Sequence, residues 1–557
     1  MLVPENRPRA PLHCRMTDTD ADALLRAIVS NPDDDTARLV YADWLQENGR
    51  PEQGEFIRTQ CRLAAATPED PEYPELLERD EELRLWLTAH APESRPEFGG
   101  GLAAGGDESH WWVSHRGFSR FLSFDGDRHP GVRAVRPLAA ALARAFERVP
   151  TRWLVLTFVS PEQLLALLKY PVLEGLRRLT IQFRPGAVEE TSDAVRALAA
   201  CPRLRNLRGL FLASRFEDAV CDALAAAPWG GLETFSGPCN DLSPAGFRVL
   251  GAAPWFRQLR VLSVGGQFPA DVFEALCGLP PLPRLHTLTL AGSTAPPAAW
   301  EAFARSRAFP ALADLKCEYN MMTEGRFEAL AGATGFALRA LSVTACGLSP
   351  GAAAALAAAP WAPALRVLKL TWTALPPGDL KALAACRRLT ALQQLDLSHN
   401  SLFGPAALAG LAANPALAGL RALRLAGYRG PGTLNAGHFD RFLAKLNLPD
   451  LRHLDLSGQP VGPTAARRLT GPKFAPLRRL GLRECRLTDA AVARLLAAPA
   501  LQNLIELDLD DNRLKTGPAA LGDPGTLPNL ASCSLGSNKL PPALVRKLRK
   551  RPGVIGL

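Results

Sequence analysis

Apolar residues recur at fixed positions within a short segment that is repeated along most of the chain. In copies that begin at Leu338, Leu392, Leu477, Leu504 and Leu530, apolar residues occupy the first, fourth, sixth and eleventh positions, and Asn or Cys occupies the ninth. Alternation of apolar and polar positions is typical of a short β-strand with one buried face. Each copy therefore predicts a strand followed by a turn at the ninth position.

The copies follow one another at a nearly constant interval. The first leucines are Leu176, Leu207, Leu232, Leu259, Leu285, Leu312, Leu338, Leu365, Leu392, Leu420, Leu451, Leu477, Leu504 and Leu530. Degenerate copies precede them at Leu122–Phe124 and Leu154–Leu156. This is the leucine-rich-repeat pattern, in which successive strands stack in parallel with their leucines inward. We predict one continuous parallel sheet of about 14 to 16 strands.

The ninth position carries a side chain that can hydrogen-bond to the backbone of neighbouring repeats. It is occupied by Asn240, Asn320, Cys346, Asn400, Cys485, Asn512 and Asn538. An amide side chain both donates and accepts hydrogen bonds. We expect these residues to satisfy buried backbone groups where the chain leaves each strand.

The segments that follow the strands are expected to be helical. Residues 349–359 and 488–498 are rich in Ala and Leu, and each is followed by a proline, which is common just past the end of a helix. A strand and a helix in each unit of this length resemble the ribonuclease-inhibitor class of leucine-rich repeats. The resemblance implies an α/β horseshoe over residues 111–557, with strands concave, helices convex and a cap at each end. It carries no function by itself.

The first part of the chain has a different pattern. Residues 16–66 predict a small all-α unit whose helices are interrupted at Asn31-Pro32-Asp33 and at Asn48-Gly49. The expected apolar faces are Leu24, Leu25 and Ile28 in the first helix, Leu39, Val40, Trp44 and Leu45 in the second, and Phe56, Ile57 and Leu63 in a third helix that opens at Gly54.

Three stretches of this unit carry a second resemblance. Asn31–Asp34, Arg38–Leu45 and Gly54–Arg58 are similar to the short repeat-companion domain that precedes repeat arrays in certain bacteria. The resemblance implies an order of companion unit, connector and repeat array, and it implies no activity. In the connector, residues 67–110, we expect a charged helix over 72–90 and a loop over 92–107. Trp111, Trp112 and Phe118 are candidates for the N-terminal cap.

The first residues and the composition of the chain bear on where in the cell the protein is expected. Residues 1–15 lack periodicity and precede the family resemblance, so we expect them to be disordered or to lie ahead of a true start at Met16. The chain has no apolar run of about 18 residues that would span a membrane. Its 11 cysteines show no paired spacing, which favours a reducing compartment. We expect a monomeric bacterial protein of the cytoplasm.

The charge is unevenly distributed. The chain carries a net charge of +9, while residues 16–55 hold ten acidic residues against three arginines, so the remainder carries 9 − (−7) = +16. A basic body can indicate a nucleic-acid partner. Here the arginines are spread over strand and helix positions, with the densest cluster at 546–551. Nucleic-acid binding is therefore kept as an alternative to a protein partner.

The chain contains no motif that predicts catalysis. Cys239-Asn240-Asp241 is similar to the Cys-x-Asp of bacterial leucine-rich-repeat ubiquitin ligases, but it occupies a repeat turn. No phosphate-binding loop, nucleophile elbow or zinc spacing is present. We expect no enzyme activity, cofactor or metal. A ligase-type enzyme remains an alternative, which would need a catalytic domain outside the repeats.

Side chains between the inward leucines are expected on the concave face, because strand residues alternate between faces. Tyr319, Trp372 and His399 share one repeat position, where aromatic residues are typical anchors of protein interfaces. The candidate protein-binding residues are Lys316, Glu318, Tyr319, Lys369, Trp372, His399, Arg479, Arg483, Asp508 and Asp510. The sequence predicts a non-enzymatic scaffold that binds another protein there.

Overall fold

The computed structural model describes residues 18–90, 97–99, 102–104, 114–115, 118–119, 121–185, 188–213, 217–238, 242–266, 270–323, 325–400, 404–427 and 434–557. The expectations for residues 1–15, for Trp111 and Trp112 and for Cys239–Asp241 lie outside these residues.

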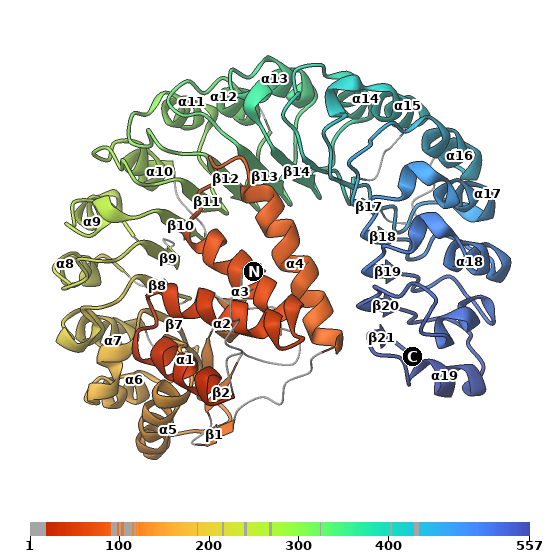
Figure 1. The fold of residues 1–557 in the computed structure, drawn as a ribbon. Coiled ribbons are helices and arrows are strands. Elements are labelled where there is room, and N and C mark those ends of the chain that lie inside the picture. The colour runs from red at the N-terminus through yellow and green to blue at the C-terminus, as the bar shows by residue number, and fades with distance from the viewer. Residues whose placement is uncertain are drawn as a thin grey trace, which may run out of the picture.

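Seventeen strands form one open, curved, parallel sheet (Figure 1). They are β5 Leu122–Asp125, β6 Trp153–Val159, β7 Arg178–Phe183, β8 Gly209–Leu212, β9 Thr234–Pro238, β10 Val261–Gly265, β11 Thr287–Ala291, β12 Asp314–Glu318, β13 Ala340–Thr344, β14 Val367–Thr371, β15 Gln394–Asp396, β16 Ala422–Arg424, β17 His453–Asp455, β18 Arg479–Gly481, β19 Glu506–Asp508, β20 Ser532–Ser534 and β21 Val554–Ile555. Each pairs in parallel with the next. The strand beyond the expected number is β21, which lacks the leucine pattern.

The helices of the repeats lie on the convex side of the sheet, outside the strands (Figure 1). They are α5 Val135–Arg148, α6 Pro161–Leu167, α7 Val188–Ala199, α8 Cys221–Ala225, α9 Pro244–Gly251, α10 Ala270–Cys277, α11 Pro297–Arg305, α12 Arg326–Ala331, α13 Ala352–Ala358, α14 Pro377–Ala385, α15 Pro405–Ala413, α16 Ala436–Lys445, α17 Gly462–Ala466, α18 Asp489–Leu496 and α19 Pro542–Leu548, with short 3-10 turns between them. The two expected helices correspond to α13 and α18. The fold is the expected α/β leucine-rich-repeat solenoid.

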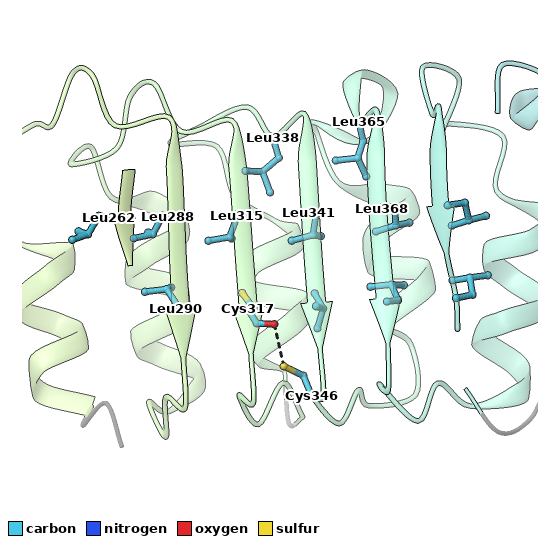
Figure 2. Packing of buried hydrophobic residues seen from close by; sticks show 14 of the residues in the cluster. Leu262, Leu288, Leu290, Leu315, Cys317, Leu338, Leu341, Cys346, Leu365 and Leu368 are labelled. Atoms are coloured by element: carbon cyan, nitrogen blue, oxygen red, sulfur yellow. Dashed lines mark hydrogen bonds between the residues drawn. The ribbon is translucent and has the colours of Figure 1, made fainter. Parts of the chain in front are cut away.

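The inward leucines make one core that runs the length of the array. Figure 2 shows Leu288, Leu315, Leu341 and Leu368 at the same position of successive strands, where they stack on one another. All four are 0% exposed. Cys317 takes a leucine position and is also fully buried. The backbone pairing Leu315↔Leu341 and Leu341↔Leu368 confirms the register read from the sequence.

Ninth-position side chains bond the backbone as expected. Asn512 donates to the carbonyl oxygens of Leu482 and Leu509 and accepts from the amides of Cys485 and Leu487. Asn320, Asn400 and Asn538 likewise donate to a carbonyl oxygen of the preceding repeat and accept a backbone amide. The thiols of Cys346 and Cys485 each donate to a carbonyl oxygen of the preceding repeat. Gln459 does the same in its repeat, donating to the carbonyl oxygen of Leu425.

The N-terminal unit has four helices, α1 Asp18–Ser30, α2 Thr36–Glu47, α3 Pro51–Ala65 and α4 Tyr73–His90. Ile28, Tyr41, Trp44, Leu45 and Ile57 belong to its core. The prediction for Leu39 and Val40 was wrong, because they are 41% and 39% exposed. The buried face of α2 instead includes Arg38, whose guanidinium donates to the carbonyl oxygen of Asp34. The third helix begins at Pro51 rather than at Gly54.

Part of the stretch expected as a loop is a strand pair. β1 Glu97–Gly99 and β2 Leu102–Ala104 are antiparallel, and β2 pairs with β5. The first strand of a solenoid has an edge with unpaired backbone groups, and a short hairpin can satisfy them with little demand on its side chains. Phe118 lies nearby in sequence in a second small pairing, β3 Ser114–His115 with β4 Phe118–Ser119.

The four N-terminal helices lie inside the hollow of the horseshoe (Figure 1). α4 begins beside the middle strands and runs through the hollow along the second half of the array, where Glu81 pairs with Arg479 (Figure 1). The connector therefore packs against the concave side, a placement that the sequence left open.

Candidate functional site

Arginines line the edge of the concave face at which the strands begin. The residues that directly precede successive strands are joined by a ladder of backbone hydrogen bonds. In its first step the amide of Arg177 donates to the carbonyl oxygen of Arg152, and further along the amide of Arg478 donates to the carbonyl oxygen of Arg452. Nine positions of this ladder are Arg152, Arg177, Arg208, Arg260, Arg339, Arg366, Arg421, Arg452 and Arg478, here called the arginine edge. Some of the arginines thus form a row along this edge, interrupted at Glu233, His286, Ala313 and Gln393, which the sequence reading did not single out. The signal was present in the sequence as an arginine directly after the first leucine.

The start of the N-terminal unit is bound to the first part of the arginine edge. Arg152 Nη2 donates to the carbonyl oxygen of Val29 at 3.0 Å. Arg177 Nε lies 3.0 Å from Asp33 Oδ2. Both contacts come from the end of α1 and the turn that follows it, so this turn is tied to the second and third strands of the sheet.

The later part of the arginine edge holds the segment around the start of α4. Arg366 Nη1 donates to the carbonyl oxygens of Glu69 and Asp70 at 2.8 and 2.7 Å. The Glu75 carboxylate lies between two arginines, 2.9 Å from Arg421 Nη1 and 3.6 Å from Arg452 Nη1.

Further along α4, Glu81 forms a two-bond pair with Arg479. Its two oxygens lie 2.6 and 2.9 Å from the Arg479 guanidinium. Arg479 is 9% exposed and is also bound by Glu506 at 2.6 Å. This proposed partner-binding residue is therefore covered by the chain's own helix and is not open to a partner while α4 is docked.

Charge complementarity explains this placement. Residues 18–90 contain 18 acidic residues and 7 arginines, a net charge of −11, so the rest of the chain carries 9 − (−11) = +20. Side-chain hydrogen bonding by Arg421 holds the pKa of Glu75 below its ordinary value. Burial opposes ionisation of Glu81, but the bonds and charge of Arg479 outweigh it and lower the pKa of Glu81 as well. Both carboxylates are thus held ionised against the basic sheet.

Glu78 lies between these two glutamates and is less well accommodated. It is 7% exposed, and its Oε1 atom has no hydrogen-bond partner within the described part of the chain. Burial and then the nearby Glu82 carboxylate raise the pKa of Glu78 to about 7, although three arginines act in the opposite direction. The interface therefore contains one carboxyl group that is costly to ionise.

Replacing Glu78 by glutamine should stabilise the docked helix at high pH. The ordinary pKa is 4.5, so the folded chain holds this proton more tightly than the unfolded chain. The corresponding stability is present below pH 4.5 and is lost as the pH rises through about 7. The total is of the order of 3 kcal/mol. Thermal unfolding at pH 5 and pH 8 should show a gain for Glu78→Gln mainly at pH 8.

A matched control is Glu47→Gln, because Glu47 is exposed on α2. Its effect should be small at both pH values. Equal effects of Glu78→Gln at pH 5 and pH 8 would contradict the buried position of the Glu78 carboxyl.

The opposite edge of the concave sheet carries the aromatic residues. Tyr319 and Trp372 directly follow β12 and β14. Their backbone amides donate to carbonyl oxygens of the next repeat, at Thr344 and Ser398 respectively. Tyr319 is 72% exposed and Trp372 is 47% exposed. Trp372 stacks on His399, with ring centroids 4.5 Å apart. Met321, which the sequence reading omitted, is also exposed. These four residues are called the aromatic edge.

The aromatic edge has an unfavourable backbone conformation. Tyr319, Trp372 and His399 have φ values of 53°, 56° and 62°. The equivalent residues in other repeats include Gly292 and Gly458, which accept this left-handed region freely. A residue with a Cβ atom costs roughly 1–2 kcal/mol there. For Tyr319 and Trp372, the exposed side chain and the backbone cost together indicate no contribution to stability.

The remaining candidate residues fall into two separate groups. Lys316 and Glu318 lie on β12 beside Tyr319, and Lys369 lies two strands away on β14. Burial lowers the pKa of Lys369, and the nearby Arg424 acts in the same direction. Arg483, Asp508 and Asp510 lie near the C-terminal end of the array instead. The ten candidates therefore do not form one site.

The C-terminal group is held together mainly by its own contacts. Arg483 Nη1 lies 3.8 Å from Asp510 Oδ2, and Asp508 Oδ1 accepts the Asp510 amide at 2.9 Å. Burial raises the pKa of Asp508 to about 6. These contacts give an acidic turn beside β19, without a side chain comparable to Trp372.

Neither a metal site nor a membrane span is found among the described residues. No group of three or more His, Cys, Asp and Glu residues there is arranged to hold a metal ion. No helix of the described chain has the length and apolar character to cross a membrane.

Comparisons with known proteins add only distant likenesses. No family model and no curated protein matches the chain. A chain in the yeast Rad7 and Elc1 complex has 17% identity and a TM-score of 0.43, covering 67% of this chain and 89% of that chain. The internalin inlF from Listeria monocytogenes str. 4b F2365 has 14% identity and a TM-score of 0.31, covering 73% and 96%. Neither likeness bears on function.

Proposed function

We propose that the chain is a non-enzymatic scaffold that binds another protein through the aromatic edge. The observation that carries the proposal is the pair Tyr319 and Trp372, both exposed and both in a conformation that glycine would adopt at lower cost. Tyr and Trp offer a large rigid contact area and dominate the binding energy of protein interfaces. Lys316 and Glu318 beside Tyr319 supply charges of both signs to the rim.

A protein partner is favoured over nucleic acid by the use of the arginine edge. A row of arginines could bind phosphates, but several guanidinium groups of the arginine edge bond the chain's own acidic unit. A salt-sensitive complex of the intact chain with DNA or RNA would favour the nucleic-acid alternative.

The test is capture of the partner by the double variant Tyr319→Ala/Trp372→Ala. Each aromatic anchor is worth about 2 kcal/mol or more at an interface, so loss of both should reduce affinity by a factor of 100 or more. Circular dichroism and thermal unfolding should show an intact fold, because neither side chain belongs to the core. Binding is measured with purified chain immobilised against an extract, followed by titration of the captured protein.

A matched control is Leu165→Ala/Val132→Ala, which removes two exposed apolar side chains at α6 and just before α5, on the convex side. This control should retain the partner. Full retention by the Tyr319→Ala/Trp372→Ala variant, with an intact fold, would contradict the proposal. Unfolding of that variant would show that the two aromatics are structural.

We also propose the location of the protein, the order of its parts and its oligomeric state. Cys317, Cys346, Cys485 and Cys533 are buried thiols at leucine or turn positions of the repeats, which supports a reducing compartment such as the bacterial cytoplasm. The resemblance of α1–α3 to the repeat-companion domain and of the array to the ribonuclease-inhibitor class supports the order of the three parts. A single chain per particle is the simplest state.

A further inference from the structure

The underside of α4 presents acidic residues at helical spacing to the basic sheet. Glu75, Glu78 and Glu81 are separated by three residues each, so they lie along one side of the helix. Glu75 and Glu81 are paired with Arg421, Arg452 and Arg479, which belong to three neighbouring repeats. The arginines are spaced by the strands, and two steps between strands span about 9–10 Å. The six residues from Glu75 to Glu81 rise about 9 Å along the helix, so the two spacings match.

The arginine that receives Glu81 is positioned by the sheet itself. Arg479 Nε is bound to Glu506 of the adjacent strand at 2.6 Å, on the side that α4 does not contact. Arg424 is oriented in a similar way by His453, whose ring nitrogen lies 3.0 Å from Arg424 Nη2. Arg479, the most buried arginine of the surface, therefore has a contact within the array that orients it for an acidic ligand independently of α4.

The docked α4 is a poor fit at its centre. Glu78 Oε1 and Glu82 Oε1 are both buried without a hydrogen-bond partner in the described part of the chain. An unsatisfied buried carboxylate oxygen lowers the affinity of an interface. The outer glutamates are about half exposed, and ion pairs of that kind are weakened by salt. The contact is therefore one that another ligand can replace.

We propose that the surface formed by Arg421, Arg452 and Arg479 binds an acidic helix of a partner protein, and that α4 is a built-in competitor for it. Release of α4 would expose this basic surface, and a helix that carries acidic residues with the spacing of Glu75 and Glu81 would take its place. This inference goes beyond the proposed function and does not depend on the aromatic edge, because the two surfaces lie at opposite ends of the strands.

The experiment uses the full chain and a defined probe. The probe is a labelled peptide of residues 72–88, held helical by a hydrocarbon staple between positions 80 and 84, which lie on the far side of the helix from Glu75. Its binding is measured by fluorescence anisotropy to wild type and to Glu75→Gln/Glu81→Gln, in which α4 has lost its ion pairs. Hydrogen exchange over α4 reports its release in the variant.

The expected result is binding to Glu75→Gln/Glu81→Gln at least about tenfold tighter than to wild type, because the competitor has been weakened. Adding Arg452→Ala and Arg479→Ala to that variant should remove the binding. The control Glu47→Gln/Glu52→Gln makes the same change of charge on α2 and α3 and should behave as wild type. Raising the salt concentration should weaken the complex.

Two outcomes would overturn the inference. One is the absence of peptide binding to the variant when hydrogen exchange shows α4 released. The other is binding of equal strength to wild type, variant and the arginine-deficient form, which would indicate nonspecific association. Neither result bears on the aromatic edge, because Tyr319 and Trp372 are not part of the arginine surface. If the inference holds, adding Tyr319→Ala and Trp372→Ala to Glu75→Gln/Glu81→Gln should leave peptide binding unchanged.

Discussion

Leu397→Asp should unfold a large part of the repeat array. Leu397 is 1% exposed, and its side chain points into the continuous core between neighbouring repeats. A carboxylate there has no counter-ion and must be buried charged or take up a proton, at a cost of roughly 4 kcal/mol or more. Thermal and urea unfolding should show a fall in melting temperature of many degrees.

Lys381→Asp is the control for that experiment, because it introduces the same residue at an exposed position of α14. It should change the melting temperature little. A Leu397→Asp variant that melts as wild type would show that the register of β15 is misassigned.

Asn512→Ala should destabilise the end of the array by about 2–4 kcal/mol. The side chain makes hydrogen bonds to backbone groups of two successive repeats, to Leu482 and Cys485 in the preceding repeat and to Leu509 in its own. Alanine leaves these buried amides and carbonyls without partners. Because repeat arrays can lose cooperativity, the measurement is hydrogen exchange of β18, β19 and β20 together with the global melting curve.

Asn503→Ala is the matched control, since Asn503 is exposed and makes one longer bond, 3.3 Å to the carbonyl oxygen of Ala475. Its exchange pattern should resemble wild type. Equal behaviour of the two asparagine variants would contradict a structural role for the ninth-position ladder.

The repeat architecture could be predicted because its causes are local. Each strand is specified by leucines two and three residues apart, and each turn by one polar side chain such as Asn400. Strand pairing then follows from repetition, since each unit can bury its face only against the next. The same reasoning located β5 and β6 from degenerate copies. It could not locate β21, because a terminal strand faces solvent on one side and needs no leucine pattern.

The second helix shows the limit of reading apolar faces without context. Leu39 and Val40 fit a helical stripe, yet they are exposed, while the charged Arg38 is buried. The choice of face depends on where α1 and α3 pack, and in a unit this small a few contacts decide it. Arg38 can be buried because its guanidinium finds the carbonyl oxygen of Asp34.

The docking of α4 could not be read from the chain, because its contacts join distant residues. Glu81 and Arg479 are 398 positions apart. The charges of both partners were visible in the sequence, but the direction in which the connector returns was not. The recurrence of arginine directly after the first leucine, as in Leu365-Arg366 and Leu420-Arg421, was the available signal for the arginine edge.

The structure divides the candidate residues between different parts of the concave face. The concave face is divided between the arginine edge, which the N-terminal unit covers in part, and the aromatic edge at the other end of the strands. Of the candidate residues, Tyr319, Trp372 and His399 lie on the aromatic edge, whereas Arg479 lies beneath α4. The binding surface we propose is therefore narrower than a whole concave face.

Site-specific photo-crosslinking tests the central claim most directly. A photoreactive phenylalanine analogue is placed at Tyr319 or Trp372 in the full chain, and at Glu301 on the convex helix α11 as the control position. We expect one discrete protein to be crosslinked from positions 319 and 372 and not from position 301. Binding through the aromatic edge would be contradicted if a discrete protein were crosslinked from position 301 and none were crosslinked from position 319 or 372.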